Sequence, residues 1–299
     1  MTVTTNRSDG GVDFRLDLDT DRLLPGRIAT GSVHIAFGNA IEVRGIVASL
    51  IATETWQHED TTTDADGTRH TETHTIHEEL QRLPVMLAGP GAFAAGETRD
   101  FKVELPVPPL GPATFQATVS RMDWRVEVKL DVAGMDPDVT ADVVVLQPTG
   151  LLRAGVIDLA EFALYGSADA VGGDATASIA LDPVPLCIGA PFRGSVTIAT
   201  GRQALQEVRL EVRSRVEATV ASGKDEQATL WTGRVAGEGE FGGGNVTIPF
   251  EGELPALWLP TSRLPHGRAD AQFHVILARA WAQDTHLARD VAICSTTEL

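Results

Sequence analysis

Residues 26–57, GRIATGSVHIAFGNAIEVRGIVASLIATETWQ, have a counterpart at residues 189–220, GAPFRGSVTIATGRQALQEVRLEVRSRVEATV. When Gly26 is aligned with Gly189, both copies contain a Gly-Ser-Val-x-Ile run, which begins at Gly31 and at Gly194. A glycine permits the turn that enters a strand, and the alternating apolar residues then face one side of a sheet. The recurrence therefore predicts a tandem of two related β-domains.

The composition of the chain agrees with two domains of ordinary size. The 299 residues are enough for two cores, and 43% hydrophobic with 22% charged residues is typical of globular proteins. No stretch approaches the roughly 20 apolar residues of a membrane-spanning helix, so no integral membrane segment is expected. The polar N-terminus, MTVTTNRSDGG, lacks the features of a secretory signal, which predicts a frayed leader and a cytoplasmic protein.

Charge and cysteine content exclude further classes. A formal net charge of −17 argues against binding nucleic acid through a broad basic surface. Cys187 and Cys294 both lie in apolar strand contexts, and two cysteines in a chain of this length make no disulfide framework. We expect two buried, reduced thiols.

Short stretches with alternating apolar and polar residues predict strands throughout the chain. The clearest is WRVEVKLDV at 124–132, where Trp124, Val126 and Val128 share one face. The first strand is expected at 13–19, and residues 82–99, with two prolines, are expected to form a loop. Further strands are expected at 31–37, 43–57, 70–80, 100–105, 139–146, 177–182, 194–199, 207–220, 228–236, 246–250, 271–281 and 288–294.

Many short strands with almost no helical spacing predict an all-β protein of two tandem immunoglobulin-like antiparallel β-sandwich domains. The N-terminal sandwich is expected at residues 1–148 and the C-terminal sandwich at 176–299, with a linker at 149–175. Residues 151–165 have the only passable helical spacing, which Gly155 weakens, and they could equally form an edge strand and a turn.

Several of these stretches resemble the arrestin-like superfamily. They are Leu24-Pro25-Gly26 with the strand that follows, the hairpin arm that ends at Trp56, FKVELPVPPLGP at 101–112 and WRVEVKLDV at 124–132. The second sandwich, from about Thr176 to Ile293, resembles the C-terminal arrestin domain. Bacterial sporulation-control proteins and the retromer subunits called Vps26 share this architecture. The resemblance implies a cytoplasmic, non-catalytic adaptor or scaffold.

Two features depart from arrestins of known roles. The strand DFRLDLD at 13–19 has Arg15 alone among three aspartates, so the phosphate sensing of receptor-binding arrestins is not expected. The chain also has no PPxY motif, so it is not expected to recruit ubiquitin ligases as alpha-arrestins do.

The best chemical candidate is a group of histidines on the two arms of one predicted hairpin. On an extended arm His70, Glu72 and His74 point the same way, and they could meet His58 across the ladder to ligate a metal such as zinc. His77 would point away. The competing interpretation, a solvated hairpin that binds nothing, carries more weight, because a metal site needs fixed four-ligand geometry. A pH-sensitive interaction surface is a further alternative.

The segment between the arms, HEDTTTDADGTR at 58–69, has the composition of a mobile hairpin tip. Asp64-x-Asp66-Gly67 is a fragment of a calcium-loop pattern without its later glutamate, and it predicts a turn. Together with Trp56 and Arg69, Asp64 and Asp66 form the predicted partner-binding part of the hairpin.

No nucleophile-elbow, HExxH or P-loop motif occurs in the sequence, so we expect no enzyme and no cofactor. The sequence instead predicts a non-enzymatic cytoplasmic adaptor or scaffold that binds unknown protein partners through loops, sheet edges or the interdomain groove. The alternatives are a metal-binding or metal-sensing protein and a structural, self-assembling sandwich protein, and a homodimer is compatible with the sequence.

Overall fold

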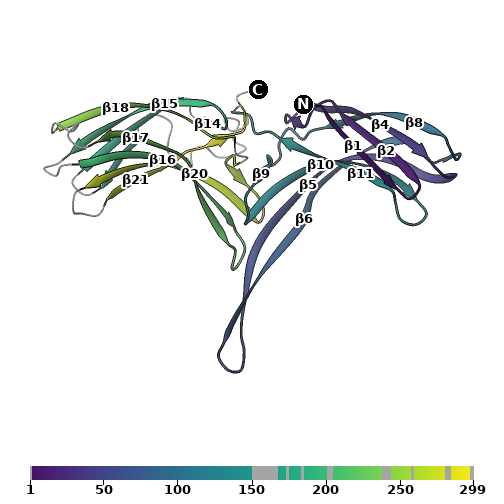
Figure 1. The fold of residues 1–299 in the computed structure, drawn as a ribbon, viewed down its shortest axis with the longest axis horizontal. Coiled ribbons are helices and arrows are strands. Elements are labelled where there is room, and N and C mark those ends of the chain that lie inside the picture. Colours follow the sequence, from purple (N-terminus) through teal and green to yellow (C-terminus); the bar gives the residue numbers. More distant parts are fainter. Residues whose placement is uncertain are drawn as a thin grey trace. The chain divides into compact units, whose positions relative to one another are not determined.

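The computed structural model describes residues 2–149, 168–172, 175–182, 185–200, 205–237, 244–256, 259–279 and 284–296. These residues form mainly antiparallel sheets packed as β-sandwiches (Figure 1), which confirms the predicted fold class. None of the described segments is a helix with the length and apolar character needed to cross a membrane.

The N-terminal sandwich consists of two sheets. One has the strand order β1-β2-β4-β8, and the other has the order β3-β11-β10-β5-β6, with β7 beside β5 and β9 beside β10. The strands are β1 (Val3–Asp9), β2 (Val12–Leu18), β3 (Arg22–Leu23), β4 (Ile28–Phe37), β5 (Ile41–Thr63), β6 (Arg69–Ala88), β7 (Gly91–Phe93), β8 (Thr98–Pro106), β9 (Phe115–Gln116), β10 (Ser120–Val132) and β11 (Asp138–Val145).

The C-terminal sandwich repeats this arrangement. One sheet has the order β12-β13-β15-β18, the other has β17-β16-β20-β19 with β21 beside β20, and β14 pairs with β22. The strands are β12 (Ala168–Gly172), β13 (Ala175–Asp182), β14 (Leu186–Cys187), β15 (Pro191–Thr200), β16 (Leu205–Ala218), β17 (Asp225–Gly237), β18 (Gly244–Glu253), β19 (Ser262–Arg263), β20 (Gly267–Arg279), β21 (Thr285–Asp290) and β22 (Ile293–Cys294). The repeat in the sequence is therefore a repeat in topology.

The chain divides into two compact units. The first comprises Met1–Thr55, Thr75–Thr114 and Arg121–Leu146, and the second comprises Trp56–His74, Phe115–Ser120 and Gln147–Leu299. The far end of the β5–β6 hairpin thus belongs to the second unit. The expected domain limits at 148 and 176 stay a prediction, because most of the linker at 149–175, including residues 151–165, lies outside the described residues.

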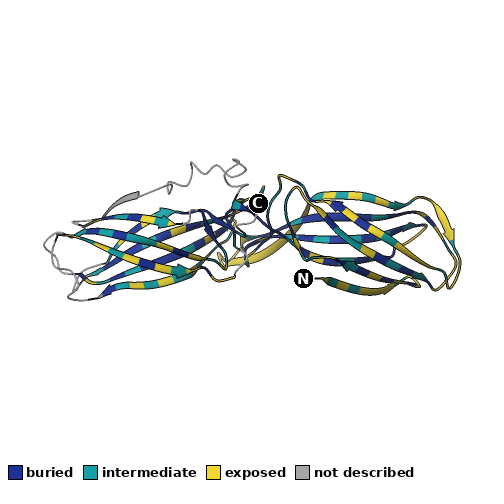
Figure 2. Ribbon diagram, turned by 90° about the horizontal axis from the view of Figure 1, so that it is seen from above, coloured by how far each residue is buried: buried dark blue, intermediate teal, exposed yellow. Residues whose placement is uncertain are grey.

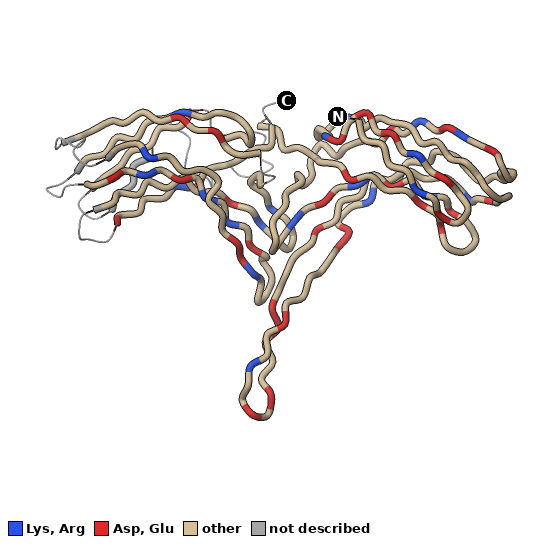
Figure 3. Tube along the Cα trace, viewed as in Figure 1, with Lys and Arg blue, Asp and Glu red and all other residues tan. Residues whose placement is uncertain are grey.

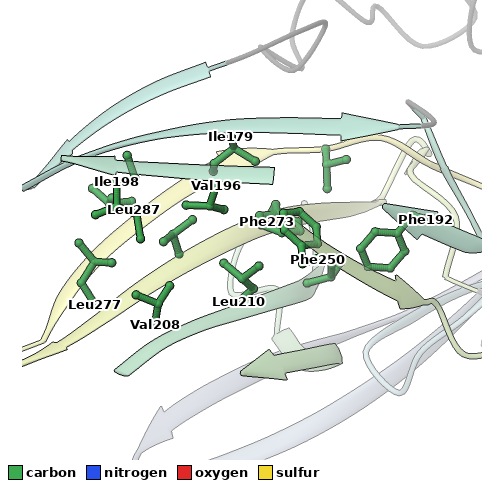
Figure 4. Close-up of a cluster of buried hydrophobic side chains, with 14 of the residues drawn as sticks. Ile179, Phe192, Val196, Ile198, Val208, Leu210, Phe250, Phe273, Leu277 and Leu287 are labelled. Atoms are coloured by element: carbon green, nitrogen blue, oxygen red, sulfur yellow. The ribbon is translucent and has the colours of Figure 1, made fainter. Parts of the chain in front are cut away.

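Alternating side chains build both cores. On β10, Trp124, Val126 and Val128 are buried while the residues between them are partly exposed, as the sequence predicted. Buried residues alternate with more exposed ones along the strands of both sandwiches (Figure 2). The C-terminal core joins side chains of both its sheets (Figure 4). Its labelled members are Ile179, Phe192, Val196, Ile198, Val208, Leu210, Phe250, Phe273, Leu277 and Leu287.

Glycines at two matched positions of the repeat have the same roles in both sandwiches. Gly26 and Gly189 have φ angles of 75° and 65°, which favour glycine in the turn before β4 and before β15. At Gly31 and Gly194 the neighbouring strand approaches too closely for a side chain. A Cβ atom there would lie 2.3 Å from the Asp17 carbonyl oxygen and 2.2 Å from that of Ala180, respectively.

A buried threonine recurs after the proline-rich loop of each sandwich. The Thr114 N–H donates to the Val145 carbonyl oxygen, and the Val145 N–H donates back to Thr114 Oγ1, both at 2.9 Å. Thr261 and Ile293 exchange the same two hydrogen bonds at the same distances. The repeated pair ties the loop to the last strand of each sandwich, and it makes Val145 and Ile293 equivalent positions.

The frayed N-terminal leader predicted from the sequence is wrong. Residues 3–9 form β1, which pairs with β2 along its whole length, from Val3 opposite Leu18 to Asp9 opposite Val12. Gly10 and Gly11 connect the two strands with φ angles of 57° and 78°, the positive values that a two-residue hairpin turn requires. The Gly-Gly pair was the sequence signal for this hairpin.

The loop predicted at residues 82–99 is also wrong in part. β6 continues through Pro84 to Ala88, and β7 follows at Gly91–Phe93. β6 is the last strand of its sheet, and an edge strand tolerates proline because its outer N–H groups need no partner. Within the linker expected at 149–175, residues 168–172 form β12, which pairs with β13.

Replacing Gly31 or Gly194 by alanine is expected to lower the free energy of unfolding by about 2–4 kcal/mol, because the new Cβ would collide with backbone of the next strand. Urea denaturation measures the change. Gly91→Ala is the matched control, since a Cβ there meets nothing within 4 Å, and it should change stability by less than about 0.5 kcal/mol. Equal stability of all three variants would refute the close approach as a constraint.

Candidate functional site

The β5–β6 hairpin ends in a turn that Asp64 organises. Its Oδ1 accepts the backbone N–H of Asp66 at 3.1 Å and that of Thr68 at 2.9 Å, and Gly67 has a φ of 80°. The other carboxylate oxygen, Oδ2, lies 3.2 Å from His70 Nε2. These hydrogen bonds, that from His70 first, lower the pKa of Asp64 from its ordinary value. The structure confirms the predicted turn.

Residues before and after this tip are held by the turn that joins β16 to β17. The Glu59 N–H donates to the Ser222 carbonyl oxygen at 2.9 Å. Lys224 Nζ lies 2.8 Å from Glu59 Oε1 and 3.3 Å from Thr73 Oγ1, so one lysine contacts both arms of the hairpin. The hairpin is therefore anchored at residues 59 and 73, and the tip extends beyond that anchor (Figure 1).

Two of the predicted histidines stack across the arms. The ring centroids of His58 and His74 are 5.3 Å apart, with 27° between the planes. Their Nε2 atoms lie 3.7 Å and 3.5 Å from the same atom, Asp60 Oδ2, and Glu72 Oε2 lies 3.8 Å from His74 Nε2. His58 Nδ1 is buried without a hydrogen-bond partner. Two imidazoles and two carboxylates thus converge on one face of the hairpin.

The predicted metal ligands are only partly brought together. His58, Glu72 and His74 lie near one another, whereas His70 binds Asp64 at the tip. His77 points away from this group, with its Nδ1 at 2.9 Å from Thr55 Oγ1. Within the described parts of the chain, no group of three or more His, Cys, Asp or Glu residues has the arrangement of a metal site. Metal binding by the hairpin stays a prediction.

The structure leaves three of the four predicted partner-binding residues on the surface. Asp64, Asp66 and Arg69 are exposed at the tip. Trp56, by contrast, is 6% exposed and stacks on His266 with 4.0 Å between the ring centroids. Its indole packs inside the second unit, as buried aromatic side chains commonly do, and does not face solvent.

The β6 strand presents a long, open and acidic edge. It is the terminal strand of its sheet, no other described strand pairs with its outer side, and residues 69–79 are all exposed. Residues 57–80 contain seven Asp and Glu residues and one arginine, and the acidic positions lie along both arms (Figure 3). Next to this stretch Arg82 donates to both carboxylate oxygens of Glu79 at 2.8 Å and to Glu127 at 2.6 Å, which fixes the base of β6.

Two residues of the site are missing from the sequence-based set. Asp60 lies two residues after His58, so the period of a strand places it on the same face, and this alternation was the available signal. Lys224 is 151 residues from Thr73, and no local pattern links the two.

Two sandwiches with matching strand order are the architecture of the arrestin-like class of proteins. This chain has that architecture and belongs to the class. The family model described as SpoOM protein matches residues 8–161, just over half of the 299 residues, and so covers the hairpin. The chain belongs to the Spo0M family, a regulatory family connected with sporulation control. No curated protein matches the sequence.

Replacing Asp64 by alanine removes the acceptor of two backbone N–H groups. We expect faster amide hydrogen exchange at Asp66 and Thr68, measured by NMR, because the turn loses its internal hydrogen bonds. Asp64→Asn is the matched control, since its amide oxygen can accept the same two bonds. Unchanged exchange in the alanine variant would contradict the role of Asp64.

The same carboxyl group gives the tip a pH dependence. Its folded-state pKa is lowered from 3.8, so its stabilisation of the turn is complete above that ordinary value and is lost as the pH falls through the lower folded value. In an NMR titration the Thr68 amide signal should therefore move with a midpoint below 3.8.

Proposed function

We propose that this protein is a non-enzymatic regulatory adaptor of the cytoplasm that binds another protein along the free edge of β6 and at the tip of the β5–β6 hairpin. The observation that carries the proposal is the exposed stretch 69–79 on a terminal strand. A regulatory role is supported by membership of the Spo0M family. No cofactor enters the proposal.

Strand addition is the binding mode that this geometry supports. The outer N–H and C=O groups of an edge strand can pair with an extended peptide, and proteins usually shorten, cover or bend such edges to prevent that pairing. β6 is 20 residues long, and Pro84 lies near its base rather than in the stretch 69–79. The outer half of the strand therefore offers a continuous set of backbone groups for a partner strand.

Charge supports a basic partner segment. Seven carboxylates against one arginine at residues 57–80 give the hairpin a strong negative field, and complementary charge raises the association rate of two surfaces. Lys224 pairs with Glu59 at the anchored base, and Arg82 pairs with Glu79. A partner strand rich in lysine or arginine would pair with the carboxylates that remain.

A truncated hairpin tests the proposal. Replacing residues 60–72 by Asn-Gly removes the tip and the outer half of the edge, and it keeps Glu59 and Thr73 beside Lys224. Capture from a lysate of the source organism, quantified by mass spectrometry, should show specific partners of the wild type reduced at least about tenfold with the truncated protein. Equal recovery with both proteins would exclude this surface.

A charge-reversal pair separates the contribution of charge from that of backbone pairing. Asp66→Lys with Glu72→Lys should weaken capture of the same partners, and raised salt should weaken capture by the wild type. Glu42→Lys with Glu251→Lys is the matched control, since it changes the net charge equally at exposed positions outside residues 57–80. Equal losses in both pairs would show that only the overall charge matters.

A second candidate function, metal binding by the hairpin, is supported by one observation, the shared orientation of His58 Nε2 and His74 Nε2 toward Asp60. If the hairpin binds metal, the protein should take up one equivalent of zinc per chain in a titration against a chromophoric chelator. Binding should be lost in His74→Ala and kept in His70→Ala, because His70 is held by Asp64. Binding that requires His70, or none in the wild type, would contradict this geometry.

A further inference from the structure

The two cysteines lie opposite each other at one end of the C-terminal sandwich. β14 and β22 pair in parallel, with Leu186 opposite Ile293 and Cys187 opposite Cys294. The two thiols are hydrogen-bonded to each other, and Cys294 Sγ also lies 3.3 Å from the Leu186 carbonyl oxygen. Both cysteines are reduced and buried.

This pairing meets the requirements of a disulfide. Adjacent strands lie about 4.8 Å apart, which is inside the Cα separation of about 4.4–6.8 Å that a disulfide needs. Paired residues of a parallel ladder direct their side chains to the same face. The remaining members of this small cluster are Ala190 and Ala292, and their short side chains put no bulky group beside the two thiols.

The equivalent positions of the N-terminal sandwich hold no sulfur. The Arg27 N–H donates to the Leu24 carbonyl oxygen, as the Ala190 N–H does to that of Cys187. Leu146 follows Val145 as Cys294 follows Ile293, and the matched threonine bonds make these positions equivalent. Leucines at 24 and 146 thus occupy the same places in the same fold. Packing there is satisfied by apolar side chains, so it does not account for two thiols.

We propose that Cys187 and Cys294 form a reversible dithiol–disulfide site whose oxidant is a hydroperoxide such as hydrogen peroxide. The Cys187 thiolate attacks one peroxide oxygen, the O–O bond breaks, and sulfenic acid forms on Cys187 while the first water leaves. The Cys294 sulfur, after losing its proton, then attacks the Cys187 sulfur. The S–S bond forms, the S–O bond breaks and the second water leaves, so two thiols and one peroxide yield one disulfide and two waters.

The environment of each thiol sets this order of attack. Cys187 keeps 5% of its surface exposed and Cys294 keeps none, so a small peroxide reaches Cys187 first. The hydrogen bond from Cys294 lowers the pKa of the Cys187 thiol, whereas the same bond and burial raise the pKa of Cys294. Cys187 is therefore the attacking thiol and Cys294 the resolving thiol.

The cross-link would join the start of the sandwich to its last strand. Directly after Cys294, the Ser295 N–H donates to the Gln147 carbonyl oxygen at 2.9 Å, and Ser295 Oγ accepts the Gln147 N–H at 3.1 Å. A disulfide would therefore restrain β22 and the segment at 147–149 that pairs with its continuation. The Cys187–Cys294 disulfide would couple the oxidation state of the cell to the rigidity of this end of the sandwich.

Peptide mapping of the full-length protein tests the site. After treatment with hydrogen peroxide and alkylation under native conditions, we expect a peptide pair linked through Cys187 and Cys294 that dithiothreitol separates. Hydrogen exchange at residues 186–190 and 291–295 should slow at least about tenfold in the oxidised protein. Reduced thiols after this treatment, or links only between different chains, would overturn the proposal.

Single and double variants define the roles. In Cys294→Ala the sulfenic acid on Cys187 has no resolving thiol, so dimedone should label it, whereas Cys187→Ala should give little label at Cys294. Cys187→Leu with Cys294→Leu reproduces the leucines of the N-terminal sandwich and should fold without any response to peroxide. Equal dimedone labelling of the two alanine variants, or an exchange response in the double variant, would refute the assignment.

Discussion

Each sandwich depends on a position where two strands come too close for a side chain. At Gly31 the Asp17 carbonyl oxygen of β2 occupies the place that a Cβ would need, and at Gly194 the Ala180 carbonyl oxygen of β13 does the same. The approach lies in the middle of the β1-β2-β4-β8 sheet and of its counterpart, so it sets how both sheets pair and bend. The alternating residues after each glycine, Val33 with Ile35 and Val196 with Ile198, are then fully buried.

That constraint explains why the sequence reveals so much of the fold. Glycines at matched positions, followed by the same apolar period, identify both sandwiches without any long-range information. The first strand escapes detection because it is polar on both faces, with Thr4, Asn6 and Ser8 on one and Thr5, Arg7 and Asp9 on the other. Only the Gly10-Gly11 turn signals its hairpin. The second half of β6 escapes because Pro84 is typical of loops, and its place on a sheet edge is a property of the tertiary fold.

Some contacts of the candidate site can likewise be predicted from the local sequence, and others depend on residues that are distant in the chain. Strand period alone places His58 and Asp60 on one face, and hairpin register brings His74 opposite them. The strand period does not reveal that His70 turns toward Asp64, because the length of the turn decides which residues face each other at the tip. The strand period also gives no sign of Lys224, because this residue contacts the hairpin only after strands distant in the sequence have paired.

The two sandwiches also separate what the fold needs from what this protein adds to it. Shared positions, such as Gly26 with Gly189 and Thr114 with Thr261, make the same turns and hydrogen bonds, so they serve the scaffold. The differences are where function is to be sought, since a fold alone specifies none. β5 has 23 residues against 14 in β16, and the extra length forms the acidic tip. Thiols replace leucines in one sandwich only. An extended hairpin in one copy and a dithiol in the other are features that neither sandwich requires for packing, which is why the proposals rest on them.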